Sequence, residues 1–136
     1  MATSALVDAG FLAALLRQRD NHRDWAASQA AQFPPPWHTC EAVLSEAFYL
    51  LGPWSFVGLS ALLLRRAVVV SFSLAEHQSP VLALMRKYAQ VPMSLADACL
   101  VRMTELVADP VLLTTDADFR LYRRHGRQVV PCVMPQ

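Results

Sequence analysis

The chain has 136 residues, of which 54% are hydrophobic and 17% charged, and its formal net charge is +1. This length indicates one domain, residues 1–136, around a single core, and the near-neutral charge gives no indication of a polyanionic partner. The high apolar fraction favours a surface that is partly covered by a partner, and hence self-association.

Cysteine content and the apolar runs limit the cellular setting. The three cysteines form no Cys-x-x-Cys pair, which argues against a disulfide framework and against a zinc cluster. The N-terminus lacks the basic start of a signal peptide, and the longest apolar run, Trp54 to Leu64, is shorter than the roughly 20 residues of a membrane span. We therefore expect a cytoplasmic protein without a membrane segment.

The first predicted element is a buried strand that begins at Ser4 and leads directly into Asp8. An apolar helix, Ala9 to Arg17, follows it. Strands of a parallel sheet with helices on both faces are apolar throughout, and open α/β sheets bind ligands beyond the carboxyl ends of their strands. Asp8 is therefore predicted to lie in a ligand crevice.

The rest of the chain alternates between helical and extended patterns. Apolar periodicity, with proline or glycine at the boundaries, predicts further helices over 20–32, 40–51, 54–66, 74–88 and 95–108. Short apolar runs predict strands over 36–39, 67–71 and 111–115, then a helical turn over 119–124 and a last strand, 128–131, on the sheet edge. This alternation predicts a single-domain α/β fold with a five-stranded parallel sheet flanked by helices.

Four acids are predicted to converge at the carboxyl edge of this sheet: Asp8, Glu46, Asp97 and Asp116. Asp8 and Asp116 directly follow strands, whereas Glu46 and Asp97 lie in helices that begin near the same edge. Clustered carboxylates need a cation, and Mg²⁺ or Mn²⁺ accepts hard oxygen ligands while keeping waters for substrate phosphates. The pattern predicts a divalent-metal site that activates water against a phosphodiester.

Several of these acids also have a structural interpretation. Asp97 occupies the third position of its helix, where it would complement the helix dipole, and Glu41 lies in a first turn where capping is favoured over catalysis. Glu46 is different, because its helical neighbours offer no cationic partner. Glu41 is kept as a supporting residue.

The two C-terminal acids are expected to differ in role. Asp116 directly follows a strand, so we favour it as a metal ligand, whereas Asp118 is expected to cap the following turn and to stay in the outer shell. Thr114 or Thr115 would orient the metal-bound water or a phosphate through a hydroxyl group.

The arginines near the C-terminus and one very apolar helix suggest binding surfaces. Arg120, Arg123 and Arg124 are candidate RNA-phosphate contacts, with a solvated helix face as the equal alternative. The Trp54 to Leu64 helix, including Leu59, has more apolar residues than one core-facing stripe requires. This excess predicts a homodimer, unless both faces of the helix are internal.

The motifs together resemble those of the PIN-domain ribonucleases, especially VapC-type toxins of toxin–antitoxin pairs. The resemblance covers the whole chain: Leu6-Val7-Asp8 before an apolar helix, Ser45-Glu46-Ala47, Ala96-Asp97-Ala98, and Thr114-Thr115-Asp116 with Phe119 three residues later. It implies a five-stranded parallel sheet, a Mg²⁺ or Mn²⁺ site made by the acids and an RNA substrate. It also implies an antitoxin that inserts an arginine among the carboxylates.

Two other classes of protein compete with a metal-dependent endoribonuclease. A non-catalytic α/β interaction module would use the acids as caps and the apolar helices for a partner. A phospho-acceptor receiver also places an aspartate at a strand end, but it needs a lysine after a late strand, and the single lysine, Lys87, precedes the helix of Asp97.

Overall fold

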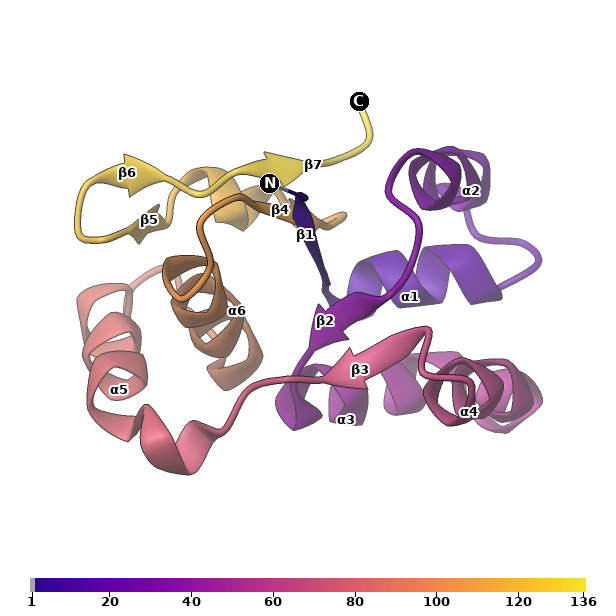
Figure 1. Ribbon diagram of the computed structural model, residues 1–136, viewed down its shortest axis with the longest axis horizontal. Helices are drawn as coiled ribbons and strands as arrows, with labels where there is room; N and C mark the ends of the chain where they lie inside the picture. The colour runs from indigo at the N-terminus through magenta and orange to yellow at the C-terminus, as the bar shows by residue number, and fades with distance from the viewer. Residues whose placement is uncertain (1) are drawn as a thin grey trace.

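The computed structural model describes residues 2–136 and forms an α/β domain (Figure 1). In this part of the chain the strands are β1 (Ser4–Val7), β2 (Trp37–Thr39), β3 (Val68–Val70), β4 (Pro110–Leu113), β5 (Arg123–Arg124), β6 (Gln128–Val129) and β7 (Cys132–Val133). The helices are α1 (Ala9–Leu16), α2 (Arg23–Gln32), α3 (Glu41–Leu51), α4 (Phe56–Leu64), α5 (Gln78–Lys87) and α6 (Leu95–Glu105).

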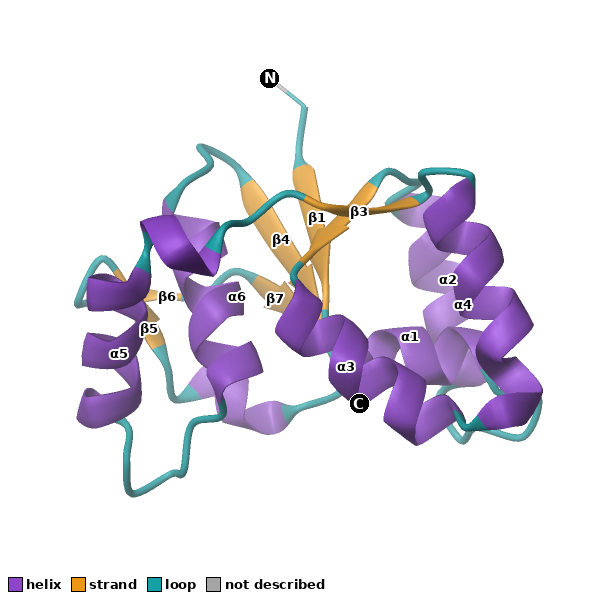
Figure 2. Ribbon diagram, turned by 90° about the horizontal axis from the view of Figure 1, so that it is seen from below, coloured by secondary structure: helices purple, strands orange, loops and turns teal. Residues whose placement is uncertain are grey.

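Five of the strands form one parallel sheet in the order β3-β2-β1-β4-β7. β1 is central and pairs with β4 along its whole length, Ser4 opposite Pro110 and Val7 opposite Leu113. Figure 2 shows α5 and α6 at one side of the sheet, α1, α2 and α4 at the other, and α3 between the two groups. The predicted fold class, a five-stranded parallel sheet flanked by helices, is therefore confirmed.

The strand order places a topological switch point in the middle of the sheet. From β1 the chain runs outward to β2 and β3, and it then returns to β4 on the other side of β1. Open α/β sheets form a crevice at such a switch point, beyond the carboxyl ends of the strands. The segments that follow β1 and β4 border this crevice.

The first helix is short and depends on packing. α1 has eight residues and would be marginal as an isolated helix, but Asp8 caps its N-terminus by accepting a hydrogen bond from the Phe11 N–H. The Phe11 ring makes edge-to-face contacts with Trp25 and Trp37, at centroid distances of 5.9 and 5.6 Å. Burial of Phe11 and its neighbours therefore fixes α1 against the sheet.

The predicted 54–66 helix is divided into a 3₁₀ turn, Pro53–Ser55, and α4. Leu59 is fully buried in the core, whereas Val57 is 73% exposed, so the two sides of α4 have different environments. No single helix within residues 2–136 is long and apolar enough to cross a membrane. α3 and the Pro53–Leu64 segment reach that length and composition only together, and they are bent by 112° at their junction.

The C-terminal segment differs from the prediction. Residues 119–124 do not form one helical turn, since a 3₁₀ turn at Ala117–Arg120 is followed by β5. The 128–131 strand is not the sheet edge either: β6 pairs antiparallel with β5, and β7 forms the edge. His125 and Gly126 have positive φ angles, 51° and 82°, and this tight turn folds β6 back onto β5.

Candidate active site

The four predicted acids lie around one cavity at the carboxyl end of the sheet. Asp8, Glu46, Asp97 and Asp116 line this cavity of about 220 Å³, which we call the acid cavity. They come from the junction of β1 and α1, from α3, from the first turn of α6 and from the loop after β4. Segments far apart in the sequence thus bring carboxylates together at the switch point.

Asp8 is the most buried member of the cluster, with 7% of its surface exposed. Its Oδ1 accepts a hydrogen bond from the Phe11 N–H at 2.8 Å, and its Oδ2 accepts one from the Thr114 hydroxyl. Burial raises the pKa of Asp8 to about 6, and the charges of Asp116 and Asp97 add to this rise, while the two hydrogen bonds oppose it. The ionised form of Asp8 is therefore disfavoured when no cation lies nearby.

Asp97 has both of the roles that the sequence left open. It forms a capping box at the start of α6, in which its backbone N–H donates to the Ser94 Oγ at 3.0 Å, and it also lines the acid cavity. Its Oδ2 accepts from the Ser94 N–H at 3.4 Å and from the Tyr122 hydroxyl at 3.0 Å. Burial is the main cause that raises the pKa of Asp97.

Tyr122 was not singled out in the sequence. Its side chain is fully buried and lies among the aromatic rings of Tyr88 and Phe119. By holding the Asp97 Oδ2, its hydroxyl leaves the Asp97 Oδ1 without a hydrogen-bond donor among residues 2–136. Tyr122 therefore orients one oxygen of Asp97 and leaves the other available.

The expectation that Asp118 caps the turn after β4 is wrong. Asp116 is the capping residue, because its Oδ1 accepts from the Asp118 N–H at 2.9 Å. The Asp116 N–H donates in turn to the Thr114 Oγ1 at 2.9 Å. The turn begins at Ala117, earlier than the sequence pattern indicated, and Asp118 lies outside the lining of the acid cavity.

Glu46 is the exposed member of the cluster. It lines the acid cavity from the middle of α3, and its carboxylate accepts no hydrogen bond from residues 2–136. Partial burial and the charges of Asp97 and Asp116 raise its pKa. Of the four carboxylates, Glu46 is thus the one that neither caps a helix nor accepts a hydrogen bond within residues 2–136.

Two small residues, Gly10 and Thr115, line the acid cavity. Thr115 lines it, whereas the Thr114 hydroxyl is already committed to Asp8 and to the Asp116 backbone. Gly10 lies against Thr115, and a Cβ atom at position 10 would overlap the Thr115 Oγ1. Glu41, in contrast, is exposed in the first turn of α3 and does not line the cavity.

The three candidate RNA-contact arginines are not equivalent. The Arg124 guanidinium donates to the backbone carbonyls of Thr104 and Val107 near the end of α6, a structural role that competes with phosphate binding. Arg123 donates to the Arg120 and Tyr122 carbonyls at 2.8 and 2.9 Å. Arg120 is exposed, and it is the member of this group best placed for an external ligand.

The donor set of the acid cavity suits a hard divalent cation. Its carboxylates supply only oxygen ligands, and the Asp97 Oδ1, the Asp116 Oδ2 and both Glu46 oxygens accept no hydrogen bond from residues 2–136. No three His, Cys, Asp or Glu side chains in this part of the chain lie close enough to hold one ion in the present arrangement. Mutual repulsion favours such a separation, and a bound cation would offset it.

The comparisons with known proteins agree with this geometry. The chain matches the PIN domain over residues 5–124, a span that contains all four acids of the cavity. Domains of this family are in general metal-dependent nucleases. A comparison with curated proteins gives no significant match.

The raised pKa of Asp8 predicts a pH-dependent cost in stability. The Asp8 carboxyl group has a pKa of about 6 in the folded chain, against an ordinary value of 3.8 for an aspartate. Its favourable contribution to the free energy of unfolding is therefore complete below about pH 4 and is lost as the pH rises through about 6. In EDTA, Asp8→Asn should be more stable than the wild type at neutral pH, by up to about 3 kcal/mol. Urea unfolding between about pH 4 and pH 8 measures this. A difference that does not change with pH would contradict the prediction.

The cap at Asp116 predicts different results for two substitutions. Asp116→Asn keeps the Oδ1 acceptor, so it should weaken Mn²⁺-dependent stabilisation with little change in metal-free stability. Asp116→Ala should weaken that stabilisation and also cost about 1 kcal/mol of unfolding free energy. Urea unfolding with and without Mn²⁺ measures both. Asp118→Asn is the matched control, and an effect on Mn²⁺ binding as large as that of Asp116→Asn would reverse the assignment.

Proposed function

This chain belongs to the PIN domain family, and from that premise we propose that it is a divalent-metal-dependent endoribonuclease that hydrolyses RNA phosphodiester bonds. The observation that carries the proposal is the convergence of four carboxylates on one cavity at the switch point of the sheet. Burial and like charges raise the pKa of three of them, Asp8, Glu46 and Asp97. A cluster of this kind favours binding of a cation, because the positive charge offsets the burial and the mutual repulsion of the carboxylates.

Within this proposal Asp8, Asp97 and Asp116 hold Mg²⁺ or Mn²⁺. The bound ion would supply an activated water and would stabilise the leaving oxygen of the phosphodiester. Glu46 would act as the general base toward the attacking water, because its pKa is raised and its carboxylate has no hydrogen-bond partner among residues 2–136. Tyr122 and Thr114 keep Asp97 and Asp8 oriented, and Thr115 contacts the substrate phosphate or the water.

We also propose that the protein is the toxin of a toxin–antitoxin pair. The support is the order of its acidic motifs, which resembles that of VapC-type toxins. An antitoxin arginine entering the acid cavity would neutralise the carboxylates and block the cation, which would explain inhibition by charge alone. A protein with this role would act on RNA in the cytoplasm.

Exposed apolar residues support a homodimer through α3 and α4. Tyr49, Val57 and Leu64 are 87%, 73% and 85% exposed, and Phe56 is 54% exposed. Leu59 belongs to the core instead, so it is not part of this surface. The same exposed surface is the feature that favours the alternative function, a non-catalytic interaction module.

RNA cleavage is the direct test of the nuclease proposal. Wild-type protein with Mg²⁺ or Mn²⁺ should cleave single-stranded RNA, and EDTA, Asp8→Asn or Asp97→Asn should each reduce the rate by at least about 100-fold. Asp118→Asn serves as the control, since its side chain lies outside the acid cavity. Cleavage that survives both EDTA and Asp8→Asn would refute the proposal. Absence of both cleavage and Mn²⁺-dependent stabilisation would favour the interaction module.

The dimer proposal is tested on exposed positions. Val57→Asp should convert a dimer to a monomer, because it places a charge in the proposed apolar interface. Light scattering at concentrations on the order of tens of micromolar measures the mass. Leu82→Asp on α5 is the matched control, since Leu82 is also an exposed aliphatic residue but lies outside α3 and α4. A monomeric wild-type protein would contradict the dimer.

A further inference from the structure

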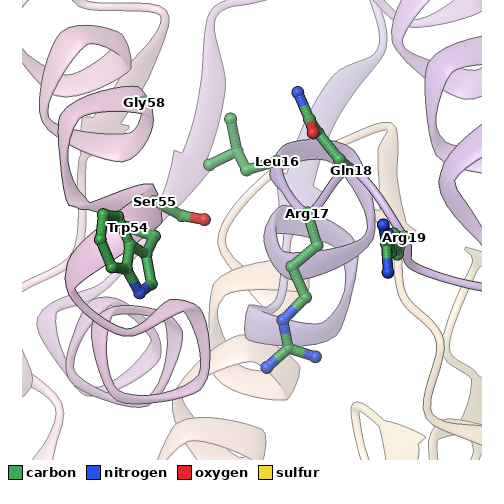
Figure 3. Close-up of a pocket in the computed structure, with 7 residues that line it drawn as sticks. All are labelled: Leu16, Arg17, Gln18, Arg19, Trp54, Ser55 and Gly58. Carbon is green, nitrogen blue, oxygen red and sulfur yellow. The ribbon is translucent and has the colours of Figure 1, made fainter.

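A second cavity, of about 620 Å³, lies between the end of α1 and the start of the Pro53–Leu64 segment. Its lining includes Arg17, Gln18, Arg19, Trp54 and Gly58, and we call it the arginine–tryptophan pocket. Figure 3 shows Trp54 on the side of the α4 segment, and Arg17 and Arg19 on the side of the chain that leaves α1. Two cations and one aromatic ring therefore border the same space.

Trp54 is unusually accessible for a tryptophan. Its side chain is 95% exposed, whereas Trp37 is 4% exposed in the core. It sits in the 3₁₀ turn that opens the segment, and Gly58, one turn further on, lies close to Leu16 of α1. The indole therefore adds little to the core, and its ring is open to a ligand.

The two arginines differ in their contacts, because Arg17 is held by other residues whereas Arg19 has no partner among residues 2–136. The Arg17 guanidinium donates to the Leu50 carbonyl and lies 4.0 Å from the Asp20 carboxylate. The Asp20 Oδ1 also accepts a hydrogen bond from the His22 N–H at 2.8 Å. Arg19 is exposed and has no hydrogen-bond or ion-pair partner among residues 2–136. The Arg19 guanidinium is thus available to an anion.

The pocket adjoins the acid cavity through α1 and the end of α3. Leu50 lines the acid cavity, and its backbone carbonyl accepts a hydrogen bond from Arg17 at the second pocket. α1 extends from its N-cap, Asp8, to Leu16, which separates the two sites by about 12 Å along the helix axis. A flexible polymer bound in the acid cavity can therefore reach the arginine–tryptophan pocket.

We propose that the arginine–tryptophan pocket binds a nucleotide of single-stranded RNA next to the cleaved bond. The base stacks on the Trp54 indole, and Arg19 and Arg17 bind the adjacent phosphates. Exposed aromatic rings beside cations are the recurring means of binding single strands without sequence preference. The pocket is thus a positive site beside an acidic one, and its charge favours RNA over an apolar protein partner. The inference rests on the proposed RNA substrate.

Tryptophan fluorescence tests this proposal independently of cleavage. Titrating the full chain with a short oligouridylate in EDTA should quench the emission of Trp54, and Trp54→Phe should abolish that quenching while keeping most of the affinity. Trp54→Ala should weaken binding, measured by fluorescence anisotropy of labelled RNA, by about fivefold to 100-fold. Arg19→Gln should weaken binding and lower the slope of log affinity against log salt by about 0.7.

Matched variants and separate readouts make the result decisive. Leu82→Ala and Arg65→Gln remove an exposed apolar side chain and an exposed cation outside the pocket, and both should leave RNA affinity unchanged. Pocket-dependent binding without any cleavage would support this inference and refute the nuclease proposal. Cleavage with unchanged affinity in Trp54→Ala and Arg19→Gln would overturn the inference alone. A loss of dimer mass in Trp54→Ala, with RNA affinity unchanged, would also overturn it.

Discussion

Three of the four carboxylates in the acid cavity also begin a helical element, and the site depends on this coincidence. Asp8 caps α1, Asp97 closes the capping box of α6, and Asp116 caps the turn after β4. Backbone N–H groups at a helix start occupy one carboxylate oxygen and partly offset its charge. In Asp97 and Asp116 the second oxygen accepts no hydrogen bond from the described residues, 2–136, so capping and ligand binding are compatible functions of one side chain.

Thr114 connects the two central strands of the sheet at this edge. Its hydroxyl donates to Asp8 after β1 and accepts from the Asp116 backbone after β4. A buried carboxylate at the end of the central strand would be costly without such a donor. The strand order then fixes where these residues meet, because β1 and β4 are neighbours on the two sides of the switch point.

The sequence predicted those features whose signals are local. An apolar strand that ends in an acid identifies Asp8 and Asp116, and the alternation of elements predicts the parallel sheet. Tyr122 had no such signal, because its partner Asp97 lies 25 residues earlier and the contact exists only in the folded chain. The edge strand was misplaced for a similar reason. The segment 128–131 suits a hairpin or a sheet edge equally, and the positive φ angles of His125 and Gly126 decide between them.

One short helix links the acidic and basic parts of the molecule. α1 has an anion, Asp8, at its N-cap and a cation, Arg17, at its C-cap, which is the arrangement that a helix dipole favours at its two ends. The same arrangement separates the carboxylates that would hold a cation from the guanidinium groups that would hold RNA phosphates. If both groups of charges lay in one cavity, arginines would pair with the carboxylates and displace the metal ion. The length of α1 therefore keeps two opposite charge environments apart and yet within reach of one RNA strand.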